Sequence, residues 1–396
     1  MMESGVQKWQ RSMIRDGIDR YRESLENYYV RNKRIVELPG GAKAFSLLSP
    51  PLGSPAARRR IRFIMRNVTA NNTVVGENGA VTWGGRTPHF LTAAVTYRCQ
   101  CDCAHCSASD YKDAVERDQT ALSVEELKDA IRQAIALGTT CVVLTGGEPL
   151  LLDGLCELIE SVDPAESVCT IFTNGELLSE DSARRLKQAG LFGVFVSLDA
   201  SQPAQHNANR RRPGLFAKAT AGVRHCQKAG LLTGLSTYAT GEKIRSGELD
   251  AMMELARRLE VLEVFLFDVI ATGRLGGERE CMLSDSEVEE IAAFRTRYNE
   301  APDYPRVIHQ TMFTSIAYPC AAEGCPAGVA QIHLRGNGDV APCDFAPFSF
   351  GNVRLKPLAQ IWEQLSHHEI YAQGSRRCRL ADPAYWDSLA AYASSI

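Results

Sequence analysis

Residues 90–106 read FLTAAVTYRCQCDCAHC, and this stretch decides the fold. Its first seven residues are mostly apolar or β-branched, which is typical of a buried strand. A short loop follows, with Cys99, Cys103 and Cys106 in the spacing C-x3-C-x2-C. Three thiolates on one loop can hold three corners of a [4Fe-4S] cluster, whose usual ligands are four thiolates. The fourth iron then keeps an open position, as metal sites that act on a substrate do. Cys101 stands outside this spacing, and we expect it not to be a ligand.

The composition indicates a large protein of a reducing compartment. The chain has 396 residues, of which 45% are hydrophobic, and this length favours two or three domains. A net charge of −3 gives no reason to expect nucleic acid as a partner. Residues 1–34 are polar, and no run of 18 apolar residues occurs, so we expect a cytoplasmic protein without a membrane span. In that setting 13 cysteines favour metal binding over disulfides.

Apolar runs alternate with amphipathic runs between residues 90 and 275. Helices are predicted from the capping box at Ser123 to Leu137, over Ser182–Ala189 and over Phe216–Ala229, each followed by glycine. The alternation predicts an α/β fold of parallel βα units. Because six strands fall short of the eight in a full barrel, we expect a partial (β/α)6 TIM-like barrel over residues 89–300. The six strand candidates are Phe90–Thr96, Thr140–Thr145, Ser167–Thr173, Gly193–Leu198, Leu231–Tyr238 and Val261–Ile270.

Residues 1–88 are expected to form a mostly helical N-terminal extension. Gln10–Asn32 has a helical pattern, and proline and glycine interrupt the chain after it. Ala56–Met65 carries several arginines. They could contact phosphate or an acidic surface, but a solvated helix face is the simpler interpretation.

The cysteine loop, directly after the first strand, resembles the signature of the radical SAM family. In that family the open iron binds the amino and carboxylate groups of S-adenosylmethionine (SAM). One electron from the cluster cleaves SAM to a 5′-deoxyadenosyl radical, which abstracts a hydrogen atom. The resemblance implies that His105, before the third cysteine, packs on the adenine. It also implies an electron donor of the flavodoxin or ferredoxin type.

Residues at the ends of the later strands resemble further motifs of this family. Gly146-Gly147-Glu148 resembles the segment that contacts the amino group of SAM. Ser197-Leu198-Asp199 resembles a segment near the SAM carboxylate or ribose. The carboxyl ends of parallel strands share one edge, where open α/β folds bind ligands. The cofactor-binding residues implied by the resemblance are His105, Gly146, Gly147, Glu148, Asn174, Ser197, Asp199, Thr237 and Ile270.

The last fifth of the chain resembles the SPASM/twitch extension of the same family. Cys325 is followed by Gly338-x4-Cys343, the pattern that ligates an auxiliary iron–sulfur cluster. The tight cysteine run of a full SPASM segment is missing, which favours a twitch-like domain over residues 301–396 with one auxiliary [4Fe-4S] cluster. If Cys320 is not a ligand, this cluster also has an open iron. The implied ligands are Cys320, Cys325, Cys343 and Cys378.

Three further residues are candidates for the catalytic machinery. Arg274 could hold a substrate anion bidentately or could be an ordinary loop arginine. Cys281 could donate a hydrogen atom to a substrate radical, although a lone cysteine is more often inert. Asp268 could act as an acid–base group. The same acid–base role is open to Tyr238, His333 and Asp344.

These motifs predict a radical SAM enzyme, with two classes of substrate open. One is a small natural-product metabolite, such as a sugar, cyclitol or nucleotide, which the auxiliary cluster could help to oxidise. The other is a ribosomal peptide, with crosslinking, epimerisation or thioether formation. The N-terminus lacks the strand-rich pattern of a peptide-binding winged helix, which favours the small molecule. A non-enzymatic zinc or iron–sulfur redox or interaction module is the alternative from another class, and metal analysis separates it.

Overall fold

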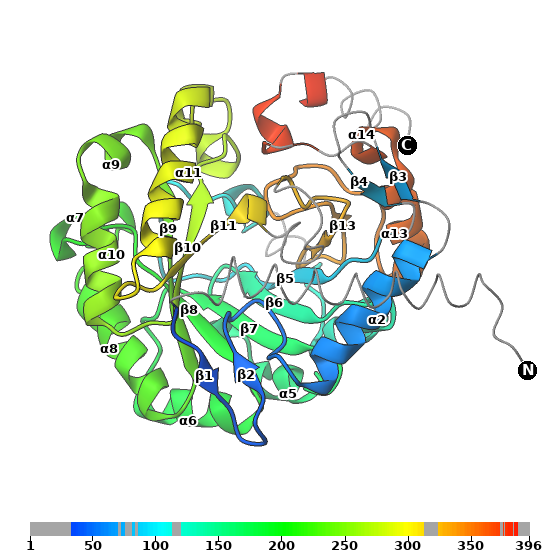
Figure 1. Cartoon of the computed structure of the whole chain (residues 1–396), viewed down its shortest axis with the longest axis horizontal. Coiled ribbons are helices and arrows are strands. Elements are labelled where there is room, and N and C mark those ends of the chain that lie inside the picture. The colour runs from blue at the N-terminus through cyan, green and yellow to red at the C-terminus, as the bar shows by residue number, and fades with distance from the viewer. Residues whose placement is uncertain are drawn as a thin grey trace, which may run out of the picture.

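A nine-stranded, mostly parallel sheet forms the centre of the computed structural model, and helices cover its outer face (Figure 1). The structure describes residues 33–69, 73–75, 81–83, 86–112, 120–312, 324–372, 375, 377–382 and 384–386. The helix expected at Gln10–Asn32 lies outside these residues. Within them, no helix combines the length and the hydrophobicity that crossing a membrane requires.

The sheet confirms the predicted α/β fold and its six strands. All neighbouring strands are parallel except the last pair, β12 and β13. The structure adds strands at both ends of the predicted six, because the chain after residue 300 contributes three short strands that the alternating pattern did not include. In spatial order the strands are β11 (Arg306–His309), β10 (Glu263–Asp268), β9 (Leu232–Ala239), β8 (Gly193–Ser197), β7 (Val168–Thr173), β6 (Cys141–Gly146), β5 (Phe90–Thr96), β12 (Gln331–Leu334) and β13 (Val340–Ala341).

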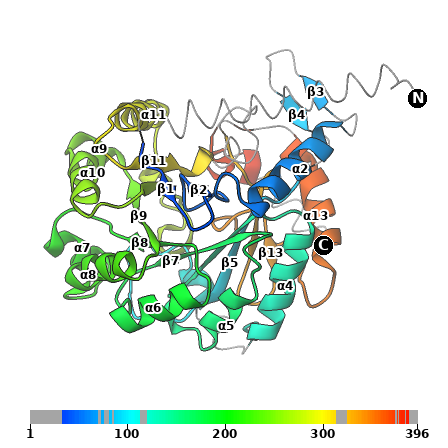
Figure 2. The same cartoon turned by 60° about the horizontal axis from the view of Figure 1, so that its bottom comes forward.

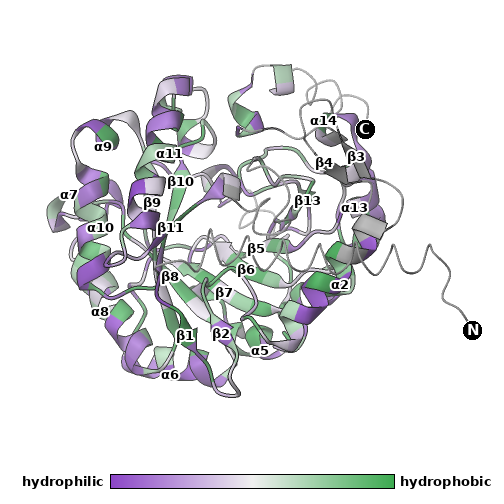
Figure 3. Ribbon diagram, viewed as in Figure 1, coloured by the Kyte–Doolittle hydropathy of each residue, from purple (hydrophilic) through white to green (hydrophobic). Residues whose placement is uncertain are grey.

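The helices between the strands bury their apolar stripes against the sheet, and the strands form the hydrophobic interior (Figure 3). The capping box of Ser123 is present, with reciprocal hydrogen bonds to Glu126. The second predicted helix begins two residues earlier than expected, because Ser179 caps it. The helices are α4 (Val124–Ala136), α5 (Leu155–Glu160), α6 (Glu180–Gln188), α7 (Pro203–Asn209), α8 (Leu215–Lys228), α9 (Gly241–Arg245), α10 (Glu248–Arg258), α11 (Asp285–Glu300), α13 (Leu358–His367) and α14 (Glu369–Ala372). Single 3-10 turns are η2 (Pro149–Leu151), η3 (Gly273–Leu275), η4 (Arg279–Cys281), η5 (Gln310–Met312) and η6 (Arg379–Ala381).

The basic helix of the N-terminal region packs against the sheet. Arg60 is fully buried and donates to Thr140 Oγ1 at 2.7 Å and to Ser49 Oγ at 3.0 Å. Arg59 donates to the carbonyl oxygen of Thr139 at 3.0 Å. A solvated face was therefore the wrong expectation for these two arginines, since both hold the helix to the start of β6. The described elements here are β1 (Val36–Glu37), β2 (Lys43–Ala44), α2 (Pro55–Thr69), β3 (Thr73–Val75) and β4 (Val81–Trp83).

The segment after β2 closes the amino end of the barrel; it appears near β1 and β2 in Figures 1 and 2. Leu47 is fully buried; its amide donates to Glu263 Oε1 at 2.7 Å and its carbonyl accepts from Thr170 Oγ1 at 2.8 Å. A side chain at Gly193 would come within 2.7 Å of Leu47 Cγ, so the close approach requires glycine. With this end filled, the carboxyl end of the strands is left to form the site.

Candidate active site

A cavity of about 580 Å³ opens at the carboxyl ends of the parallel strands. The cysteine loop forms one wall, and all four of its cysteines line the cavity. The ends of β6 to β10 form the remaining walls, as expected for ligand sites of open α/β sheets. The predicted residues that line it are His105, Gly146, Gly147, Asn174, Ser197, Thr237, Asp268, Ile270 and Arg274.

The loop cysteines differ in how readily they ionise. The Cys101 thiol shares hydrogen bonds with Cys99 and Cys103; these lower the pKa of Cys99 to about 6, lower that of Cys103 and raise that of Cys101. Burial raises the pKa of Cys106. Thiolates are the form that binds metal, so the environment favours Cys99 and Cys103 as ligands and leaves the proton on Cys101.

The donor set fits an iron–sulfur cluster. The three spaced cysteines reach the cavity from one loop, and thiolates are the usual ligands of [4Fe-4S] clusters. Among the residues that the structure describes, no three His, Cys, Asp or Glu side chains are arranged around a single ion. A cluster is a larger body, in which each thiolate binds a separate iron.

Arg274 holds the cysteine loop in place. Its guanidinium forms an ion pair with Asp102 and donates to the carbonyl oxygens of Asp102 at 3.0 Å and Cys103 at 3.2 Å. Its backbone amide donates to Cys106 O at 3.1 Å. These contacts occupy the side chain that the sequence offered as a substrate anchor. The structure thus shows Arg274 as a residue that positions the cysteine loop, and substrate binding by its side chain stays a prediction.

The two glycines after β6 let this strand end touch the cysteine loop. Gly146 has φ of +126°, and a Cβ there or at Gly147 would collide with the carbonyl oxygens of residues 96–98. The amide of Gly147 donates to Thr96 O at 2.7 Å. Close packing of backbone on backbone therefore fixes the loop relative to the sheet.

Glu148 lies behind the cavity wall and does not line it. Its carboxylate is fully buried and accepts from Thr173 Oγ1 at 2.6 Å and from the Asn174 amide at 2.8 Å. Burial raises the pKa of Glu148 to about 7. The predicted cofactor residue Asn174 is thus positioned by Glu148, and its side chain lies 4.0 Å from Cys99 Sγ.

Asp199 is also buried behind the wall. Arg210 donates to both of its carboxylate oxygens, at 2.9 and 2.7 Å, and His105 Nε2 lies 3.7 Å away. Burial opposes ionisation, but Arg210 and His105 outweigh it and keep the pKa of Asp199 at about 2. Burial lowers the pKa of His105 to about 4. Asp199 therefore holds His105 at the cavity. Ser197 lines the cavity directly, and its hydroxyl accepts a hydrogen bond from Ser236 Oγ at 3.0 Å.

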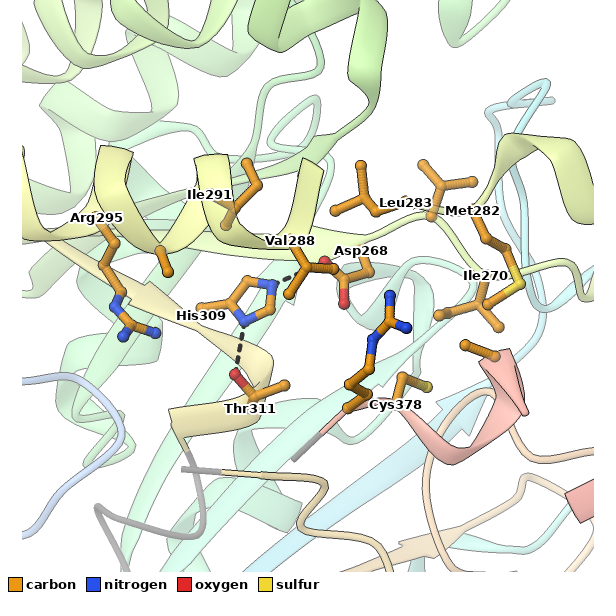
Figure 4. Close-up of a pocket in the computed structure, with 14 residues that line it drawn as sticks. Asp268, Ile270, Met282, Leu283, Val288, Ile291, Arg295, His309, Thr311 and Cys378 are labelled. Carbon is orange, nitrogen blue, oxygen red and sulfur yellow. Dashed lines mark hydrogen bonds and ion pairs between the residues drawn. The ribbon is translucent and has the colours of Figure 1, made fainter. Parts of the chain in front are cut away.

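A second cavity, of about 350 Å³, is drawn in Figure 4. It adjoins the first, since Asp268, Val269 and Ile270 line both cavities. Asp268 Oδ1 accepts from His309 Nε2 at 2.7 Å, and His309 Nδ1 lies 2.8 Å from Thr311 Oγ1. Sequence reasoning missed His309, because it ends a strand of only four residues. The remaining lining residues are Met282, Leu283, Val288, Ile291, Ala292, Arg295, Arg377, Cys378 and Ala381.

The C-terminal cysteines form a separate group. Burial raises the pKa of Cys378, and electrostatic interactions with Cys325 and Cys343 raise it further. They fit a second cluster site, and Cys378 also borders the second cavity. Cys320 lies outside the described residues. Cys281 is in η4 and lines neither cavity.

Comparison with known proteins agrees with this arrangement. Residues 94–256 match the model of the radical SAM superfamily, and residues 325–381 match SPASM, an iron–sulfur cluster-binding domain. An AdoMet-dependent heme synthase of Nitratidesulfovibrio vulgaris is 25% identical over 302 residues, which cover 72% of this chain and 81% of that protein. A PqqA peptide cyclase of Rhizobium meliloti is 26% identical over 290 residues, which cover 72% of this chain and 76% of that protein.

The fold has counterparts among solved structures. SuiB of Streptococcus suis, bound to S-adenosylmethionine, superposes with a TM-score of 0.57 at 15% identity, covering 80% of this chain and 70% of that one. The first family implies a [4Fe-4S] cluster with SAM, and the SPASM domain implies an auxiliary iron–sulfur cluster. With the loop cysteines at one cavity and Cys378 at the next, the chain belongs to the radical SAM enzymes that carry a C-terminal SPASM domain.

Proposed function

We propose that this radical SAM enzyme acts on a small molecule that has an apolar body and an acidic group. The observation that carries the proposal is the second cavity beside the SAM site. Met282, Leu283 and Val288 give it an apolar wall, and Arg295 supplies a guanidinium that suits a carboxylate.

The protein side of the chemistry centres on Asp268. When bound, the cluster on the loop cysteines would supply the electron that cleaves SAM and so start hydrogen abstraction, and the auxiliary cluster would take the electron left on the oxidised substrate. Asp268 borders both cavities, and its carboxylate is held by His309 and by Gln310 Nε2 at 3.0 Å. We assign to the Asp268–His309 pair the proton that leaves the substrate as it is oxidised.

The relatives support two classes of substrate. Heme, named in the heme synthase, is a flat apolar ring with carboxylate arms, which agrees with the lining of the second cavity. The relative named PqqA peptide cyclase supports the second candidate, a peptide substrate. The size of the second cavity, about 350 Å³, favours the small molecule, because a peptide needs a longer groove.

Two adjacent alanines of α11 provide a matched test. Both alanines are exposed, but only Ala292 lines the second cavity, and Ala293 lines neither cavity. Reconstituted enzyme is incubated anaerobically with SAM, dithionite and one of three kinds of probe: a porphyrin that carries carboxylate groups, smaller carboxylic acids or peptides. We expect a small acid to stimulate 5′-deoxyadenosine formation, Ala292→Trp to abolish the stimulation and Ala293→Trp to preserve it. Stimulation by peptides alone, or equal behaviour of both variants, contradicts the proposal.

A further inference from the structure

A buried lysine lies behind the wall of the SAM cavity. Lys243, in α9, is only 6% exposed and is not among the residues that line the cavity. Its Nζ donates to the carbonyl oxygens of Asp199 and of Tyr238, the latter at 3.0 Å. The same nitrogen lies 3.4 Å from the centroid of the Tyr238 ring. An ammonium has three N–H donors, and two carbonyls and an aromatic face offer one acceptor for each.

Lys243 thereby joins three parts of the cavity wall. Asp199 follows β8, and Tyr238 stands near the end of β9, so one ammonium connects the ends of two neighbouring strands. The Tyr238 ring in turn lies 4.4 Å from the ring of His105, on the cysteine loop. Both rings line the cavity, and the Tyr238 hydroxyl accepts from Asn209 Nδ2 at 3.3 Å. Each neighbour of Lys243 is thus part of the wall or directly behind it.

Packing alone does not explain a charge at this position. Burial of an ammonium is unfavourable, and it lowers the pKa of Lys243 to about 8 although Asp199 and Glu248 oppose this shift. A methionine would fill similar space without the desolvation cost. Only a charged ammonium can donate to two carbonyl oxygens and contact the face of an aromatic ring at the same time.

We propose that Lys243 is a positioning residue that keeps the Tyr238–His105 wall in place for the adenosyl half of SAM. Two aromatic rings in a cavity wall offer flat surfaces on which a purine packs. Lys243 fixes the first ring directly and the second through it. The methionine half of SAM, which the family resemblance assigns to the open iron, would not depend on this wall.

The test compares ligands that contain adenosine with one that does not. Cluster-loaded Lys243→Met is assayed by equilibrium dialysis with S-adenosylhomocysteine and 5′-deoxyadenosine. L-methionine binding is followed through the electron paramagnetic resonance spectrum of the cluster. We expect both adenosine ligands to bind about tenfold more weakly, as loss of a desolvated cation–π contact allows, with L-methionine unchanged. Lys228→Met, at an exposed lysine paired with Glu180, is the control and should change none of the three.

Two outcomes overturn the proposal. One is unchanged affinity of Lys243→Met for both adenosine ligands. The other is an equal loss for L-methionine, which would indicate general disturbance of the site. If Lys243→Met does not fold, Tyr238→Leu replaces it, because it removes the ring and leaves both carbonyl acceptors of Lys243 in place. That variant must show the same selective loss, and its absence also overturns the proposal.

Discussion

Among single residues, Asp268 carries the sharpest prediction about chemistry. Its carboxylate borders both cavities and accepts the His309 hydrogen bond at 2.7 Å. If the pair takes the substrate proton, Asp268→Asn should lower the yield of oxidised product about 100-fold. Cleavage of SAM should continue, because Asp268 holds none of the loop cysteines. Liquid chromatography with mass spectrometry of 5′-deoxyadenosine and product in one anaerobic incubation measures both.

Two further substitutions frame this prediction, one at the partner of Asp268 and one control. His309→Asn should lower the yield of product in the same way, since it removes that partner. Asp303→Asn, at an exposed aspartate before β11, should leave both yields unchanged. A parallel fall of 5′-deoxyadenosine and product in Asp268→Asn would mean that the residue acts on SAM binding instead.

Residues whose position depends on close neighbours in the chain were predictable. The spacing of the loop cysteines and the glycines of the Gly146-Gly147 turn belong to this class. Glu148 was expected at the cofactor, yet its carboxylate holds Asn174 from behind the wall. Its position depends on Thr173 and Asn174, which join it only when β6 and β7 pair, and one-dimensional patterns carry no such information.

Among the elements, the segment that closes the amino end of the barrel predicts a pH dependence. The Glu263 carboxylate accepts a hydrogen bond from the Leu47 amide. Burial raises the pKa of Glu263 from 4.5 to about 7, although the charge of Arg306 opposes this shift. Because the folded pKa lies above the unfolded one, this contribution to stability is complete below about pH 4.5 and is lost as pH rises through 7. We predict that Glu263→Gln removes up to about 3 kcal/mol of this pH-dependent change in the free energy of unfolding.

Urea denaturation of the cluster-free protein across this pH range measures the effect. Glu148 has a raised pKa in the same direction, so the variant should flatten the slope without abolishing it. Glu300→Gln, at an exposed glutamate of α11, should keep the slope of the parent. A slope equal to the parent's in Glu263→Gln would show that Glu263 is ionised throughout.

Elements with long periodic patterns were predictable, and short ones were not. All six strands of the alternating region were found within a few residues. β11 and β12 have four residues each, too few for an alternation to be recognised. The apolar run around Leu47 stands among prolines and glycines, so its burial under Gly193 became evident only in the fold.

In the whole molecule, the SPASM region is part of the central sheet and not a separate appendage. β12 pairs in parallel with β5, the strand that leads into the cysteine loop, with Gln331 opposite Phe90. Arg354 extends the contact by an ion pair with Glu126 of α4. These contacts involve none of the auxiliary cysteines, so changes at those cysteines should leave the cluster on the loop cysteines in place.

This arrangement leads to a prediction about metal content. Two four-iron clusters give about eight irons per chain; Cys343→Ala should retain about half and still cleave SAM. Oxidised product should disappear, because the electron left on the substrate then has no acceptor. Cys103→Ala should also keep about half of the iron but lose SAM cleavage. Iron analysis and 5′-deoxyadenosine assays of anaerobically prepared protein test this prediction.

The control is Cys156→Ala, because Cys156 is in α5 and lines neither cavity. Oxidised product at the parent rate in Cys343→Ala would refute the role of the auxiliary cluster as electron acceptor. Zinc in place of iron would refute both clusters.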